Sequence, residues 1–261
     1  DIDNRNSRYY RLFRGFFLER WLLAALMPWH VERPNLIVAS SEETAEITVR
    51  AFGVSAERVV VSGLPRNDVL LGPPHRQLLA TEFPVAFREA LSAGRMLFLY
   101  LPTFRDGGRH DPGIDWRRVS ELMERVGGQF FCKFHPDDRS SVRPATLPYI
   151  TELARSLDVY PLLPHLDALV SDYSSVIFDF MLLDRPIIYF TPDVEEFAAR
   201  TRKLNWQPEE LGIGPICKEF DELMSAMEAA ANAEGLAGPQ AREAVLPRLH
   251  RYVDGQACTR V

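Results

Sequence analysis

Short runs of apolar residues recur along the chain, separated by stretches in which apolar residues have helical spacing. The runs at residues 96–102, 129–136, 167–172 and 186–190 carry few polar residues before their ends and do not alternate. Strands of this kind are covered on both faces, as in parallel sheets flanked by helices. The sequence therefore predicts an α/β fold with a Rossmann-like, doubly wound parallel sheet.

The composition limits the function classes. The chain has 261 residues, of which 46% are hydrophobic and 25% charged, which is typical of a soluble globular protein. A net charge of −6 argues against a nucleic-acid-binding protein. The three cysteines are far apart and form no disulfide framework or CxxC pair, which favours a reducing compartment. No run of 18 apolar residues predicts a transmembrane helix.

Polar clusters follow four of the expected strands, namely the first three runs above and a further apolar run at residues 58–62. They occupy residues 62–71, 101–108, 133–136 and 171–175. The carboxyl ends of parallel strands meet at one edge of a sheet, where ligands bind in folds of this kind. We therefore expect the four clusters to form a single polar site.

The cluster SDYSS places Ser174 and Ser175 at the start of an expected helix. Free backbone N–H groups and hydroxyls there bind anions such as phosphate, although Ser174 acting only as a helix cap is an alternative. Asp179, one turn later, would orient a serine or face solvent. No GxxxxGK[ST] motif is present, so the site is not a P-loop.

Other clusters add charged candidates. His135 would donate to a phosphate or act as an acid or base, with an ordinary surface histidine as the alternative. Arg105 is a candidate for charge-assisted phosphate binding. Arg66, Asn67 and Asp68 form a polar turn, for which simple loop chemistry is the alternative.

Taken together, these motifs resemble the CDP-glycerol glycerophosphotransferase family, the polymerases of teichoic acid and capsule. The matching elements run in the family's order over about residues 36–261. They are Gly63-Leu64-Pro65-Arg66-Asn67-Asp68, Pro102 to Asp106, Lys133 to Pro136, Ser171 to Asp179, Arg185 to Ile187 and Asp254-Gly255.

The resemblance implies a GT-B-type arrangement of two Rossmann-like domains, with a CDP-activated donor bound by the C-terminal one. It implies that His135 is catalytic and contacts the pyrophosphate together with Ser174 and Ser175. The other donor-pocket residues it implies are Thr103, Arg105, Asp172, Arg66, Asn67, Asp68 and Asp179. The implied reaction moves glycerol phosphate, or a related polyol phosphate, to an acceptor hydroxyl and releases CMP.

The sequence departs from the family in one respect. The family's His-Gly-Thr-Pro element, whose histidine is the expected base, has no match here. We therefore expect a donor-binding portion of a longer enzyme, with the N-terminal domain largely absent. The alternatives are a GT-B glycosyltransferase that uses a sugar nucleotide, or a non-catalytic nucleotide-binding module. No dedicated carboxylate cluster for a metal is visible, although a divalent cation such as Mg²⁺ could accompany the pyrophosphate.

The expected organisation has four parts. Residues 1–35 form an amphipathic helical segment, 36–63 the end of the N-terminal domain or the crossover, 64–238 the CDP-donor domain, and 239–261 a C-terminal helix and tail. Residues 8–30 are basic and rich in aromatics, so this segment would lie on an anionic membrane or pack on a neighbouring domain. We expect a cytoplasmic protein held at the inner face of the membrane, with a lipid-linked or polymeric acceptor.

Overall fold

The computed structural model describes residues 34–72, 83–105, 111–135, 138, 144, 147–200, 204–233 and 239–261. The predicted amphipathic segment at residues 1–35 lies outside this part of the chain, apart from its last two residues. Among the described residues, no helix is both long and apolar enough to cross a membrane.

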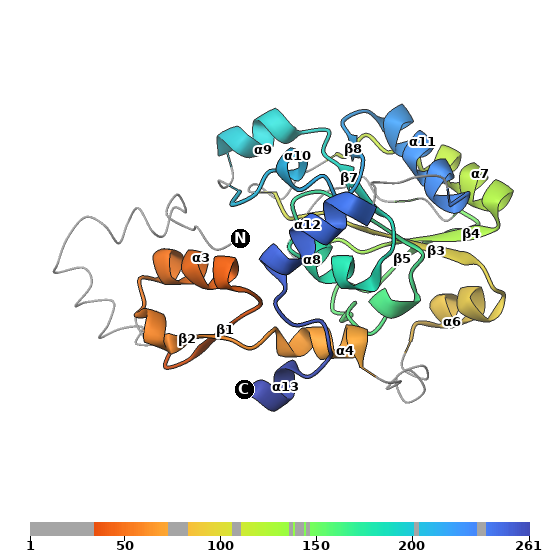
Figure 1. The fold of residues 1–261 in the computed structure, drawn as a ribbon. Coiled ribbons are helices and arrows are strands. Elements are labelled where there is room, and N and C mark those ends of the chain that lie inside the picture. The colour runs from red at the N-terminus through yellow and green to blue at the C-terminus, as the bar shows by residue number, and fades with distance from the viewer. Residues whose placement is uncertain are drawn as a thin grey trace, which may run out of the picture.

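The main body is a six-stranded sheet in the order β5-β4-β3-β6-β7-β8, and every neighbouring pair is parallel (Figure 1). The strands are β3 (Met96–Leu101), β4 (Gly128–Cys132), β5 (Ile150–Glu152), β6 (Ala168–Ser171), β7 (Ile187–Phe190) and β8 (Ile216–Cys217). The prediction of an α/β fold with a parallel sheet is confirmed.

Both faces of this sheet are buried, which explains why its strands read as continuous apolar runs. Successive residues of β3 alternate between two hydrophobic cores: Leu97 and Leu99 belong to one, and Phe98 and Tyr100 to the other. Helices α7 (Trp116–Val126) and α11 (Phe220–Ala231) cover the second core. Helices α6 (Val85–Ser92), α8 (Val176–Phe180) and α12 (Pro239–Leu249) cover the first. The sheet is therefore doubly wound.

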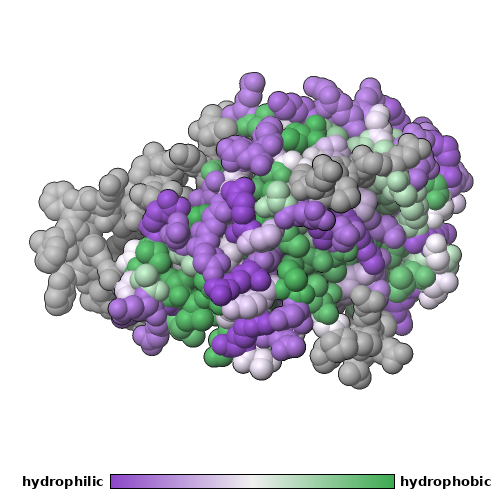
Figure 2. Space-filling model, viewed as in Figure 1, coloured by the Kyte–Doolittle hydropathy of each residue, from purple (hydrophilic) through white to green (hydrophobic). Residues whose placement is uncertain are grey.

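A smaller unit precedes this body. Strands β1 (Ile37–Ala39) and β2 (Val59–Val61) form a separate parallel pair, with α3 (Glu42–Phe52) between them in the chain. Ser41 caps α3 through a reciprocal pair of bonds with Thr44, and Gly53 ends the helix with a left-handed backbone. Figure 2 shows hydrophobic side chains gathered over this unit, where Leu36, Phe52 and Val60 are exposed.

The C-terminal segment returns to the small unit. Figure 1 shows α12 in front of α8 and beside α3, and α13 (Ala257–Arg260) close to α4 (Asp68–Leu71). The side chains of Val245 and Leu249 enter a core of the large sheet. The backbone N–H of Arg251 donates to Ser40 O at 2.8 Å. Residues 239–251 therefore touch both sheets.

Several elements differ from the sequence-based expectation. Strand β5, strand β8 and helices α9 (Val194–Arg200) and α10 (Pro208–Leu211) were not predicted, because they are short or lack an apolar run. The expected helix after SDYSS is also shorter, because α8 ends at Phe180 and continues only as a 3₁₀ turn, Met181–Leu183. The sequence also predicts a helix near residues 76–92, and in the described part of this range the structure has α6.

Candidate functional site

The strand order places the polar loops at a topological switch point. Counted within the large sheet, the order is 3-2-1-4-5-6, so the winding direction reverses between β3 and β6. In sheets of this order, ligands bind outside the carboxyl ends of the strands at this reversal. Leu101 of β3 pairs with Ser171 of β6, so the loops at Pro102–Arg105 and Asp172–Ser175 leave the sheet side by side.

Asp172 ties these two loops together. Its carboxylate is 1% exposed and accepts hydrogen bonds from Thr103 N at 2.9 Å and Thr103 Oγ1 at 2.6 Å. It also accepts from Tyr173 N at 2.6 Å. The structure therefore brings the predicted residues Thr103 and Asp172 together, and their polar groups hold one another.

Arg105 is buried beside them. Its guanidinium forms a bidentate pair with Asp193 at 2.7 and 3.0 Å, and Nη2 lies 2.8 Å from Asp172 Oδ2. Burial alone would lower the pKa of Arg105, but the hydrogen bonds of Asp193 and the charge of Asp172 outweigh it and raise the pKa. Arg105 is therefore a permanent cation already engaged with two carboxylates, and any phosphate contact would be additional to these.

Aromatic rings cover this ion-pair cluster. The rings of Tyr173 and Phe197 stack with centroids 3.9 Å apart, and the guanidinium of Arg105 lies 5.3 and 4.8 Å from their centroids. A cation held against aromatic faces and carboxylates is well ordered. The cluster therefore fixes the loop that leads to the two serines.

Ser174 and Ser175 keep free donors. Ser174 Oγ is 3.5 Å from Val176 N, which is long for a capping bond, and Ser175 is exposed. Among the described residues, the backbone N–H groups of Ser174 and Ser175 donate to no protein acceptor. Two amides and two hydroxyls at the switch point are thus available to an anionic ligand.

Asp179 takes neither of the two roles considered from the sequence. It is 1% exposed, and its Oδ2 accepts from Arg66 Nε at 2.9 Å and from Tyr160 Oη at 2.6 Å. Burial first, and then the charge of Asp179, raise the pKa of Tyr160. The carboxylate therefore anchors α8 to the turn that carries Arg66, whose side chain remains 48% exposed.

In the described part of the chain, Asp68 and Asn67 form no hydrogen bond with Ser174 or Ser175. Asp68 accepts from the N–H groups of Ala257 and Cys258, both at 2.8 Å, so it caps α13, and Asn67 is buried. Gly63 opens the turn with φ +82°, and a Cβ there would lie 3.2 Å from Ala257 Cβ. The Gly-x-Pro-Arg-Asn-Asp turn and the Asp254-Gly255 element thus contact one another through α13.

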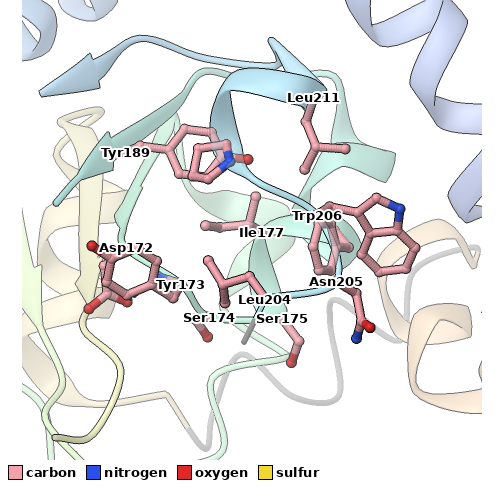
Figure 3. A pocket seen from close by; sticks show the side chains of 12 residues that line it. Asp172, Tyr173, Ser174, Ser175, Ile177, Tyr189, Leu204, Asn205, Trp206 and Leu211 are labelled. Carbon is pink, nitrogen blue, oxygen red and sulfur yellow. Dashed lines mark hydrogen bonds between the residues drawn. The ribbon is translucent and has the colours of Figure 1, made fainter. Parts of the chain in front are cut away.

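Two hollows adjoin the switch point. The first, which we name the donor-side hollow after the role expected for its serines, lies between Asp172–Ser175 and the segment 204–211 (Figure 3) and encloses about 500 Å³ including its open mouth. The second, of about 320 Å³, is lined by Pro102–Arg105 and His135, whose ring lies 5.0 Å from that of Phe104. The structure therefore groups Ser174, Ser175 and Asp172 at one hollow and Thr103, Arg105 and His135 at the other. Arg66, Asn67, Asp68 and Asp179 line neither.

Three residues of the donor-side hollow and its border were missed from the sequence. Tyr189 and Trp206 line the hollow, and Glu43 accepts a hydrogen bond from Trp206 Nε1 at 2.7 Å. Tyr189 stands inside an apolar run, and Trp206 lies in a segment that carries none of the motifs quoted above. Gly214 could have drawn attention to that segment, because a Cβ there would come within 2.0 Å of Ile187 O.

No three His, Cys, Asp or Glu side chains of the described ranges form a group that could hold a metal ion. A divalent cation that arrives with a pyrophosphate therefore remains a prediction from the resemblance.

Comparison with known proteins supports the family assignment. Residues 25–261 match the family model of CDP-glycerol:poly(glycerophosphate) glycerophosphotransferases, and the chain belongs to this family. It is 27% identical over 213 residues to the teichoic acid ribitol-phosphate primase of Bacillus spizizenii, covering 80% of this chain and 54% of that protein. It is 29% identical over 236 residues to the ribitol-phosphate polymerase TarL of Staphylococcus aureus, covering 85% and 39%.

The fold has a counterpart among solved structures. The wall teichoic acid polymerase TagF superposes with a TM-score of 0.70 and 23% identity, over 86% of this chain and 56% of that one. The chain thus spans about half the length of these relatives, or less.

Proposed function

We propose that this chain forms the donor-binding side of an enzyme that transfers glycerol phosphate, or a related polyol phosphate, from a CDP-alcohol to an acceptor hydroxyl. The product would be a teichoic-acid-like or capsule polymer. One observation carries the proposal: in a member of this family, the unpaired amides and the hydroxyls of Ser174 and Ser175 lie at the switch point, beside an open hollow.

In this proposal, the two serines bind the diphosphate of the donor. Four neutral donors can bind an anion without having to break an existing ion pair, unlike the guanidinium of Arg105. His135 follows β4, on the other side of β3, and would bind the diphosphate from there. Thr103, Asp172 and Arg105 would act by holding the loops, and Asp179 with Arg66 by holding α8.

The chemical step is a direct displacement. The acceptor oxygen forms a bond to the β-phosphorus, and the bond from that phosphorus to the bridging oxygen breaks. CMP leaves with the electron pair, and the proton of the acceptor hydroxyl passes to a base. Negative charge grows on the leaving CMP, where the amides of the serines and His135 would stabilise it. Positioning and charge stabilisation supply most of the catalysis of such a step.

Three further assignments belong to the proposal. Residues 36–63 are the end of an N-terminal domain or the crossover, 64–238 the donor domain, and 239–261 the C-terminal helix and tail. The acceptor is a lipid-linked or growing polymer, and the protein works in the cytoplasm at the inner face of the membrane. The location at the membrane is supported by the family of the chain and by the basic, aromatic-rich composition of residues 8–30.

Calorimetric titration of the 261-residue chain with CDP-glycerol, CMP and UDP-glucose tests the proposal. We expect the CDP compound to bind more tightly than the other two. Preference for UDP-glucose would instead support a sugar-nucleotide glycosyltransferase, and no binding of CDP-glycerol would overturn the proposed function.

A set of variants locates the site. Changing Ser174 and Ser175 together to Ala, or His135 to Ala, should each weaken CDP-glycerol binding about tenfold or more, because charge-assisted bonds are lost. The matched control changes Ser55 and Ser92 to Ala, since both are exposed and distant in the fold. Equal affinity in the site variants and the control would place the diphosphate elsewhere.

A further inference from the structure

The donor-side hollow has a chemistry that suits a neutral ligand group. Among the described residues, its lining contains one charged side chain, Asp172, which is already paired with Arg105, and no Lys, Arg or His. The rest is mostly aliphatic and aromatic, with a few polar groups from the serines, Asn205 and Tyr189. An apolar wall with few polar groups is the usual make-up of a small-molecule site. Beyond the serines, the described lining offers a phosphate no cation, whereas an uncharged part of a donor would fit.

Tyr189, like Tyr173, places on this lining a buried hydroxyl that has no hydrogen-bond partner among the described residues. Tyr189 lies on β7 and is 2% exposed. Figure 3 shows its ring extending from the strand toward the side of the hollow that holds Leu211 and Trp206. Buried hydroxyls are normally paired, so an unpaired one on a cavity wall is available to a ligand that enters the cavity.

The hollow also has a defined position relative to the serines and the small unit. Ser174 and Ser175 stand at one margin, and Tyr189 and Leu211 at the opposite one (Figure 3). Trp206 forms a further wall, packs edge-on against Phe178 at 5.4 Å, and bonds to Glu43 of α3. The hollow therefore extends from Ser174 and Ser175, the proposed diphosphate-binding residues, toward the unit that contains β1, α3 and β2.

This position favours the alcohol over the nucleoside. The group that is transferred must meet the acceptor, and the two-domain arrangement implied by the family resemblance would bring the acceptor from the side of the N-terminal domain. The donor-side hollow borders the small N-terminal unit through Trp206, whereas the described lining of the hollow of His135 comes from loops of the large sheet and from Pro112. Hydroxyls on a short carbon chain can bond to Tyr189 and Asn205 while its C–H groups pack on the aromatic walls.

We propose that the donor-side hollow binds the alcohol of a CDP-alcohol, and that the hydroxyl of Tyr189 bonds to a hydroxyl of that alcohol. Tyr189 is thus a specificity-determining residue that favours donors carrying a polyol over CDP alone. The inference rests on the proposed function, because it requires a diphosphate bound at Ser174 and Ser175.

The test is Tyr189→Phe in the 261-residue chain, titrated with CDP, CDP-glycerol and CDP-ribitol. The change removes one hydroxyl and keeps the ring, so the fold should be retained. We expect affinity for one or both CDP-alcohols to fall about five- to tenfold while affinity for CDP stays within twofold. The control Tyr252→Phe removes a hydroxyl near α13 and should change neither.

Each other outcome is decisive. An equal loss for CDP and the CDP-alcohols would mean that the hollow holds the nucleoside or diphosphate, and would overturn the inference while keeping the proposed function. Unchanged affinities for all three would show that the hydroxyl of Tyr189 contacts no donor. Failure of the unaltered chain to bind any CDP compound would overturn the proposed function, and the inference with it.

Discussion

Trp206 Nε1 donates a hydrogen bond to Glu43 Oε1 at 2.7 Å, and this bond joins the wall of the donor-side hollow to helix α3. The same carboxylate accepts two bonds from Arg248 of α12, at 2.9 and 3.0 Å. One side chain therefore holds together the small N-terminal unit, the C-terminal helix and the donor-side hollow. Its hydrogen bonds with Arg248 outweigh partial burial and lower the pKa of Glu43, so it is ionised at neutral pH.

Replacing Glu43 should loosen this junction. We expect Glu43→Ala to lower the free energy of unfolding by about 1 kcal/mol, since the pair is partly exposed and screened. The tryptophan emission should also shift, and the shift should be absent in a Trp206→Phe background. Denaturant titration and fluorescence measure both effects. The control is Glu46→Ala, which changes an exposed residue of the same helix. An equal loss of unfolding free energy there would show that the hydrogen bonds of Glu43 add no stability of their own.

Arg105 should matter mainly for stability. Its removal leaves Asp172 and Asp193 close together without their cation, and breaking a buried pair in this way costs about 3 kcal/mol or more. We therefore expect Arg105→Ala to be strongly destabilised in urea or guanidinium titrations. The exposed Arg117→Ala should change stability by less than about 0.5 kcal/mol. An Arg105→Ala protein of near-normal stability that has lost donor binding would instead make Arg105 a direct ligand.

His250 should make the fold sensitive to mild acid. It is 4% exposed, and its Nε2 lies 2.9 Å from Phe178 O on α8. Burial lowers the pKa of His250 below the ordinary value of 6.5, which outweighs the hydrogen bond to Phe178. The unfolded chain then binds a proton more readily than the folded one, so its contribution is complete above about pH 6.5 and declines as the pH falls toward the folded pKa.

The measurement is the unfolding free energy of the unaltered chain and of His250→Gln at several values between pH 7.5 and 5. Glutamine can still donate to Phe178 O but does not titrate in this range. We expect the decline toward acid to be smaller in the variant. Parallel curves for the two proteins would assign the pH dependence to other groups.

Residues 8–30 should bind anionic membranes if the proposed location is correct. The prediction is co-sedimentation of the chain with vesicles that contain anionic lipid, weakening as salt is raised, and little binding to neutral vesicles. Replacing Arg8, Arg11 and Arg14 with Gln should reduce it. Sedimentation that is absent, or insensitive to salt and to these changes, would contradict the role given to this segment.

The central strands of the large sheet could be predicted because burial on both faces leaves a direct signal in the sequence. Apolar runs located β3, β4, β6 and β7, and each strand end then located its polar loop. The two-residue strand β8 left no such signal, since its pairing with β7 depends on the backbone of Gly214 passing close to Ile187.

The partners of the site residues could not be predicted in the same way. Asp193 lies 88 residues from Arg105, and Asp179 lies 113 residues from Arg66, so only the folded chain brings them together. The sequence showed that these residues are polar and near strand ends. It could not distinguish a side chain that faces a ligand from one that holds a loop.

The contacts of the C-terminal helices determine the order in which parts of this fold can form during synthesis. Arg248 and Leu249 connect the two sheets, and α13 is capped by Asp68, near the start of the described chain. During synthesis all strands of the large sheet are available once β8 has emerged, but the small unit cannot take its final place until α12 and α13 are free of the ribosome. We therefore expect a nascent chain stalled with these two helices still inside the ribosome to have a paired sheet and an unattached β1–α3–β2 unit.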